Sequence, residues 1–218
     1  MRVRRRAGLL GLVAALAVVP PAHGQEAASV LAAAEAHYAP VATLCADFVQ
    51  HRAIPLLGEE RTGRGRLCQA RPDRFAMRFT DPEGDVVVMD GAWVWLYWPS
   101  TDPVQVVKLP VTDVPGGFDL HREFLSEPMT KYRAEYVGVE AVDGRDAHRI
   151  RLRPLRPTSY QVATVWIETG TPRLRQVRLE EENGSVRTIT LRDIQVGVTP
   201  PAGWFSFSPP PGAQVITG

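Results

Sequence analysis

The sequence lacks the short motifs that usually mark an enzyme or a metalloprotein. It contains no HxxxH or HExxH pair, no GxSxG, no Walker-type glycine loop and no GxGxxG after a strand. Its two cysteines do not have metal-site spacing. His121 and Glu123 resemble half of a metal motif, but a solvated helix face is the simpler interpretation. We therefore expect no metal, no cofactor and no enzymatic activity, although a hydrolase built from converging carboxylates would leave no such motif.

The sequence also lacks a clear excess of charge of either sign. It has 25 Lys+Arg against 24 Asp+Glu, and four of the arginines lie within residues 1–24, which hold no acid. The remaining 21 basic and 24 acidic residues give residues 25–218 a net charge of −3 with His neutral. This balance does not indicate a nucleic-acid partner. No low-complexity or linker-like stretch divides residues 25–218, so we expect one β-rich domain.

The N-terminus has the layout of a secretory signal peptide over residues 1–24. A basic start is followed by an apolar stretch at 7–19, two prolines, and small residues at Ala22 and Gly24 before Gln25. The alternative is a membrane anchor, for which the apolar stretch is short. Because no cysteine lies near the cleavage site for lipidation, we expect a soluble periplasmic product.

The two cysteines, Cys45 and Cys68, lie almost equally far along the chain from Leu57, where Pro55–Gly58 predicts a hairpin turn. Residues equidistant from such a turn face each other with Cβ atoms about 4.5–5.5 Å apart, which is close enough for a bridge after a small adjustment. In an oxidising compartment this pair favours a disulfide. Two buried free thiols are the alternative.

The remaining pattern predicts one helix followed by many strands. Alanine-rich residues 27–38 predict an amphipathic helix that ends at Pro40. Alternating apolar runs bounded by Gly, Pro and Asp then predict ten or eleven strands, with a last alternating segment at 204–208. A short helical insertion is expected at 118–125. An antiparallel sheet of this size curls or closes, and the two helical segments must cover its concave face.

One predicted strand, residues 93–98 (WVWLYW), is apolar on both faces. A sheet with one solvated face would carry polar residues at alternate positions. Packing in the core explains most of these apolar residues. An apolar cavity that takes a ligand explains why the apolar surface is so large. The alternation places Trp93, Trp95 and Tyr97 on one face and Val94, Leu96 and Trp98 on the other.

Several short motifs follow one another along the chain. They are ADFVQ at 46–50, GRGRL at 63–67, RPDRF at 71–75, DG at 90–91 with WLYWP at 95–99, and FSFSPPPG at 205–212. In this order and spacing they resemble the LolA family, the periplasmic carriers of outer-membrane lipoproteins. The two cysteines depart from the usual pattern of that family, and residues 118–125 match its lid only loosely.

The resemblance implies a mainly β fold with short helices, in which a single strongly curved antiparallel sheet forms an incomplete β-barrel lidded by helices. Residues 25–218 would form this carrier domain, and its apolar cavity would take the acyl chains of lipoproteins. The side chains expected to line that cavity are Phe48, Phe75, Met77, Phe79, Trp95, Tyr97, Phe118 and Phe124.

The resemblance also implies partners and one special residue. The carrier, expected as a monomer, would receive acylated lipoproteins from an inner-membrane ABC-type release complex and pass them to an outer-membrane lipoprotein receptor. Arg71 matches the arginine that latches the lid by hydrogen bonds; without the resemblance it would be a solvated strand-end residue. A module of the same fold for another lipid, or an envelope-stress sensor, is the alternative function.

Overall fold

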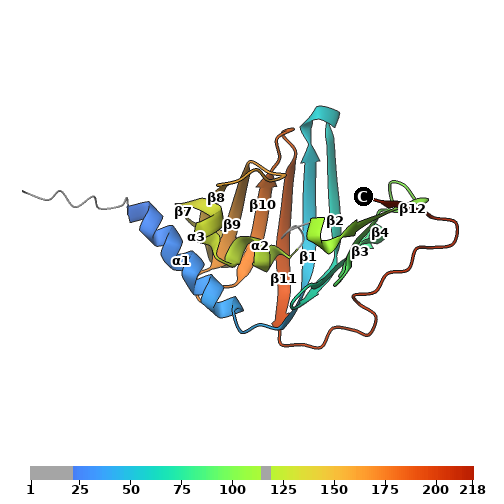
Figure 1. The fold of residues 1–218 in the computed structure, drawn as a ribbon. Coiled ribbons are helices and arrows are strands. Elements are labelled where there is room, and N and C mark those ends of the chain that lie inside the picture. The colour runs from blue at the N-terminus through green and yellow to red at the C-terminus, as the bar shows by residue number, and fades with distance from the viewer. Residues whose placement is uncertain (1–21, 114–118) are drawn as a thin grey trace, which may run out of the picture.

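The computed structural model describes residues 22–113 and 119–218, which form a mainly β fold with three short α-helices (Figure 1). The helices are α1 (Ala22–Tyr38), α2 (Leu120–Leu125) and α3 (Pro128–Lys131), with 3₁₀ turns η1 (Pro55–Leu57) and η2 (Val111–Asp113). The strands are β1 (Thr43–Ile54), β2 (Glu59–Ala70), β3 (Arg74–Asp81), β4 (Glu83–Asp90), β5 (Trp93–Tyr97), β6 (Gln105–Pro110), β7 (Tyr132–Val142), β8 (Arg145–Pro154), β9 (Val162–Glu168), β10 (Leu174–Glu180), β11 (Val186–Val196) and β12 (Gln214–Thr217).

All twelve strands belong to one curved, unclosed sheet in the order β12-β6-β5-β4-β3-β2-β1-β11-β10-β9-β8-β7. The expected fold class is confirmed. The register shifts by one residue between β1 and β11, between β2 and β3, and between β3 and β4, and an extra residue of this kind bends a strand and increases its twist. At Gly65 a Cβ would collide with the carbonyl oxygen of Arg78, so glycine allows β2 and β3 to approach at this bend.

The C-terminal tail differs from the prediction. Residues 204–208 do not form a strand, and β12 instead pairs parallel with β6 further along the chain. The Arg78 side chain donates hydrogen bonds to the carbonyl oxygens of Trp204 and Ser206 at 2.9 and 2.7 Å, so these backbone acceptors are engaged by a side chain instead of a neighbouring strand. The tail therefore packs across the outer face of the sheet.

The predicted helix is confirmed, although it begins at Ala22 instead of Ala27. Its buried residues Ala27, Leu31, Ala34 and Tyr38 recur at helical spacing and form the stripe that packs on the sheet. Figure 1 shows α1 and α2 lying against the concave face. Within the described residues, no helix has both the length and the apolar composition needed to cross a membrane.

Apolar side chains pack on both faces of the sheet. Phe48, Met77 and Phe124 belong to the large concave cluster beneath the helices. Trp95 and Tyr97 belong to a separate cluster on the opposite face, where residues of the C-terminal tail cover them. The ring centroid of Phe207 in that tail lies 5.8 Å from that of Trp95 and 5.7 Å from that of Tyr97. The alternation predicted for residues 93–98 is therefore correct, but the assignment of Trp95 and Tyr97 to the cavity is wrong.

Cys45 and Cys68 face each other across β1 and β2 and form a disulfide. They are separated by 23 positions in the sequence. Closing a loop of that size in the unfolded chain stabilises the folded state by about 3 kcal/mol in the chain-entropy account.

We expect the double variant C45S/C68S to lose about 3 kcal/mol of unfolding free energy, because its unfolded chain regains the freedom that the bridge removes. Urea denaturation of the variant and the oxidised wild type measures the difference. Adding a reductant should lower the wild-type midpoint toward that of the variant and leave the variant unchanged. A wild-type midpoint insensitive to full reduction would contradict the prediction.

Candidate functional site

The concave face is the part of the molecule that could enclose an apolar ligand. Phe48, Phe75, Met77, Phe79 and Phe124 lie in one continuous cluster there. The predicted Phe118 lies outside the described residues. Phe48 and Phe124 are 1 and 2 % exposed, so in this state α1 and α2 close directly onto the sheet and side chains fill the space beneath them. An apolar ligand can enter that space only if a helix moves.

Arg71 holds the C-terminal end of α1. Its guanidinium nitrogens Nη1 and Nη2 donate to the carbonyl oxygens of Ala39 and Tyr38, both at 3.0 Å. The last carbonyls of a helix have no partner within the helix and carry partial negative charge. Arginine suits such a helix end, because its forked N–H groups donate to the unpaired carbonyls and its permanent positive charge complements their partial negative charge. Arg71 therefore connects the β2–β3 turn to the end of α1.

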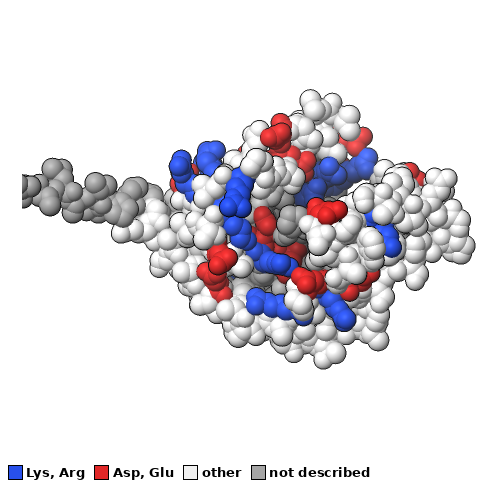
Figure 2. Space-filling view, viewed as in Figure 1, with Lys and Arg blue, Asp and Glu red and all other residues white. Residues whose placement is uncertain are grey.

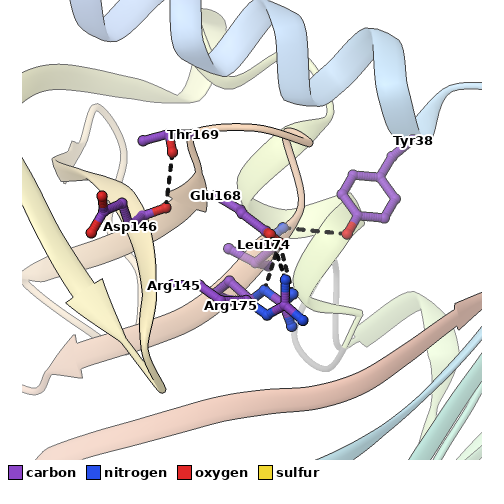
Figure 3. Close-up of polar contacts among 7 residues, drawn as sticks. All are labelled: Tyr38, Arg145, Asp146, Glu168, Thr169, Leu174 and Arg175. Atoms are coloured by element: carbon purple, nitrogen blue, oxygen red, sulfur yellow. Dashed lines mark hydrogen bonds and ion pairs between the residues drawn. The ribbon is translucent and has the colours of Figure 1, made fainter.

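Tyr38 attaches the same end of α1 to the opposite wall. Its hydroxyl accepts a hydrogen bond of 3.3 Å from the backbone N–H of Leu174 at the start of β10 (Figure 3). Burial raises the pKa of Tyr38 to about 12, so the hydroxyl remains protonated at neutral pH. Nearby, Glu168 pairs with Arg175 at 2.7 Å and with Arg145 at 3.2 Å, which ties β8, β9 and β10 together where the helix docks.

The N-terminal end of α2 is held by both local and long-range hydrogen bonds. Asp119 caps the helix by accepting from the backbone N–H groups of His121 and Arg122, each at 3.0 Å. The His121 ring nitrogen Nδ1 lies 2.9 Å from Oε1 of Gln69, and Arg122 pairs with Asp73 at 2.8 Å. His121 is 3 % exposed, so its interpretation as part of a solvated helix face is wrong.

Burial strongly affects the ionisation of His121. Its pKa is lowered to about 4, mainly because burial disfavours the charged ring and further because Arg71 and His37 are nearby, while Asp119 opposes the shift. The ring is therefore neutral at neutral pH. With Oε1 of Gln69 as acceptor, Nδ1 carries the proton. The ring also packs against Tyr38, with centroids 4.1 Å apart, so this histidine joins the two helices.

The C-terminal end of α2 is attached through Glu123. One carboxylate oxygen, Oε1, accepts from the hydroxyls of Tyr132 at 2.5 Å and Tyr160 at 2.6 Å. Lys131 Nζ donates to the carbonyl oxygens of Arg122 and Glu123, both at 2.7 Å. Burial raises the pKa of both tyrosine hydroxyls, which keeps them protonated as donors. Sequence reasoning missed this group, because its members are widely separated and form no motif.

An open pocket of about 390 Å³ continues the concave face beyond the helices. Its apolar floor consists of Phe79, Leu96, Trp98 and Val107. Phe79 stacks edge-on with Phe48 of the covered cluster, at a centroid distance of 4.9 Å, so floor and covered interior are continuous. The rest of the lining is polar and comprises Gln50, Arg52, Arg61, Thr62, Asp85, Ser100, Thr101, Asp102, Gln105 and Arg187, together with Gly63 and Pro82.

The comparisons with known proteins decide the family. The sequence pattern of the family described as outer membrane lipoprotein carrier protein LolA matches residues 39–208. The chain belongs to the LolA family. An outer-membrane lipoprotein carrier protein of Alkalilimnicola ehrlichii is 28% identical over 95% of this chain and 92% of its own length. One from Chromohalobacter salexigens is 30% identical over 70% of each chain.

Solved structures share the fold at lower identity. An uncharacterized conserved protein from Thermus thermophilus has a TM-score of 0.55 and 18% identity, over 89% of this chain and all of its own. MucB has a TM-score of 0.51 and 16% identity, over 84% of this chain and 63% of its own. These likenesses show that both proteins share the fold of this chain. In the described residues of this LolA-family chain, no three His, Cys, Asp or Glu side chains gather as a metal site requires.

We expect acid to weaken the attachment of α2 through His121. The unfolded state has the ordinary histidine pKa of 6.5 and the folded state about 4, so the unfolded chain binds a proton first as pH falls. Stability is therefore lost between pH 6.5 and 4, by roughly 2 to 3 kcal/mol at pH 4.5 relative to pH 7.

Urea denaturation of the wild type and H121N at both pH values measures this contribution. The loss on acidification should be smaller in H121N by about that amount, because asparagine does not titrate. H51N, which replaces an exposed histidine, is the matched control and should behave like the wild type. Equal acid sensitivity of H121N and the wild type would contradict the prediction.

Proposed function

We propose that this protein carries lipoproteins through the periplasm, with their acyl chains held on the concave face of the sheet. The observation that carries the proposal is the continuity between the open pocket at Phe79 and the covered cluster at Phe48. A chain bound at the pocket could extend beneath α1 and α2 when they lift. Membership of the LolA family and the names of the curated relatives support the same role.

The energetics suit a carrier that must also release its cargo. Burying one methylene is worth about 0.8 kcal/mol, so one long acyl chain offers on the order of 10 kcal/mol before costs are subtracted. Opening the closed state subtracts from this affinity. Leu31 and Phe124 occupy the space that a chain would need, so their return to the sheet favours release.

The remaining parts of the proposal follow from this role. Residues 1–24 would direct export and be removed, leaving residues 25–218 as a soluble monomeric carrier without enzymatic activity. The donor would be an inner-membrane ABC-type lipoprotein release complex, and the acceptor an outer-membrane lipoprotein receptor. The closed arrangement of α1 and α2 fits the carrier without cargo, before a bound acyl chain has displaced the helices.

Two measurements on cells test the function. Native mass spectrometry of the protein purified from its own periplasm should find an adduct with the mass of an acylated lipoprotein. Depletion of the protein should leave lipoproteins behind in the inner membrane. Another lipid as the adduct, together with normal lipoprotein sorting after depletion, would support the alternative of a lipid-binding or envelope-sensing module and contradict the carrier.

Arg71→Leu should loosen α1, because it removes both hydrogen bonds to the end of the helix. We expect about a tenfold shift toward the open state, which corresponds to 1.4 kcal/mol, with cargo retained for longer. Loading and transfer of a purified lipoprotein to its receptor measure this effect. The control is Arg74→Leu, an exposed arginine at the start of β3. Loading and transfer indistinguishable from the control would show that Arg71 is no latch.

A further inference from the structure

Three arginines stand in a row across the open end of the concave face. Arg52 on β1 lies directly opposite Arg187 on β11 and directly opposite Arg61 on β2. Directly opposed residues of antiparallel strands project from the same face. All three arginines line the open pocket, and Figure 2 shows Lys and Arg side chains gathered below the tip of the β1–β2 hairpin.

Such a row is unfavourable unless something compensates for it, because like charges directly opposite each other destabilise a sheet. The two outer arginines have acidic partners: Arg61 pairs with Glu59 at 2.7 Å and Arg187 with Glu181 at 3.3 Å. The central Arg52 has no ion pair or hydrogen bond to another side chain in the described part of the chain. One positive charge is therefore left uncompensated in the middle of the row.

Unused donors also point to a missing anion. The Nε atoms of Arg52 and Arg187 are buried and have no hydrogen-bond partner among the described residues. Burial and, to a smaller extent, the charge of Arg52 lower the pKa of Arg187, while its partner Glu181 opposes the shift. Guanidinium groups bind carboxylates and phosphates through paired hydrogen bonds, which makes these oxyanions the natural occupant.

The two acids of the same pocket are used elsewhere. Asp85 accepts hydrogen bonds from the backbone N–H of Ser100 at 3.1 Å and from its hydroxyl at 2.7 Å. Asp102 accepts from the backbone N–H of Val104 at 3.1 Å. Within the described residues no ion pair joins either of them to the arginine row. Asp85 and Asp102 therefore hold the connection between β5 and β6, and the arginine row on the opposite wall of the pocket keeps its positive charge.

The cationic wall lies beside an apolar floor. Along the inward face of β1, Phe48 is followed by Gln50 and then Arg52, so the surface changes from apolar to polar to charged toward the open end. Phe79 approaches the inward face of β2 closely at Gly63, where a Cβ would lie 2.7 Å from its Cε1 atom. A ligand that fits both surfaces has an apolar chain and one anionic group at its end.

We infer that the row Arg52, Arg61 and Arg187 binds the anionic head of an amphiphile, a phosphate or a carboxylate, while the chain lies on Phe79, Leu96 and Trp98. The inference shares the apolar floor with the proposed function and goes beyond it by assigning the pocket a further class of ligand, an amphiphile with an anionic head. Arg52 donates from the centre of the row, where it has no ion-pair partner among the described residues, and Arg61 and Arg187 flank it on the neighbouring strands. The pocket thereby distinguishes charged from uncharged amphiphiles with the same chain.

Isothermal titration of the mature protein with dodecyl phosphate, dodecyl maltoside and inorganic phosphate, each below micelle-forming concentration, tests this. We expect dodecyl phosphate to bind at least roughly tenfold more tightly than dodecyl maltoside. Arg52→Gln should abolish that preference without weakening dodecyl maltoside binding, and it should not lower the melting temperature, because it relieves repulsion. Arg187→Gln is a second variant with the same expected direction.

The control is Arg153→Gln, an exposed arginine on β8 away from the pocket, which should keep the wild-type preference. Equal binding of both amphiphiles, unchanged in Arg52→Gln, would overturn the head-group site and leave the apolar floor intact. If inorganic phosphate binds but neither amphiphile does, the arginine row binds anions and the apolar floor does not bind the chain. Binding of none of the three would refute both.

Discussion

Leu31 of α1 and Phe124 of α2 belong to one apolar cluster, and through this cluster the two helices bury the concave face of the sheet. The other features of the site depend on this burial. A sheet of twelve strands that does not close leaves a broad apolar surface, and the described helices that cover it have only 17, 6 and 4 residues. Helices of 6 and 4 residues are too short to be stable alone in water, so they exist because they pack on that surface. Anything that competes for the surface therefore competes with the helices themselves.

Hydrophobic burial is not directional, so the position of each helix must be set by polar contacts around it. These contacts are of two kinds. Arg71 and the Arg122–Asp73 pair are exposed, and water can replace them at small cost. The contacts of His121 and Glu123 are largely buried, and breaking them leaves polar groups without partners, which is costly. Each helix combines both kinds of contact: the end of α1 is held by the exposed hydrogen bonds of Arg71 and by the buried hydrogen bond between Tyr38 and Leu174.

The sequence was sufficient to predict which residues share a face, but not which face becomes concave. The alternation of Phe75, Met77 and Phe79 and the equal distances of the two cysteines from their turn are local properties, and the structure agrees with both. Trp95 was placed on the wrong side because its cover, the C-terminal tail, lies more than 100 residues further along the chain. His121 was taken as solvated because its partner Gln69 is 52 positions away and belongs to no motif. Long-range packing decided each of these cases.

The two ends of the concave face differ in a way that gives a bound chain a direction. At the helix-covered end, Tyr38 and His121 close the surface with buried aromatic rings, which suits the apolar end of a ligand. At the open end, Gln50 and Arg52 replace the apolar residues of β1, and charged groups there remain near water. Burying a charge without a partner is far more costly than leaving it at an open rim. An amphiphile inserted head first would bury its head beneath the helices, so under the proposed mode of binding we expect its apolar end to lie toward α1 and its head at the open end.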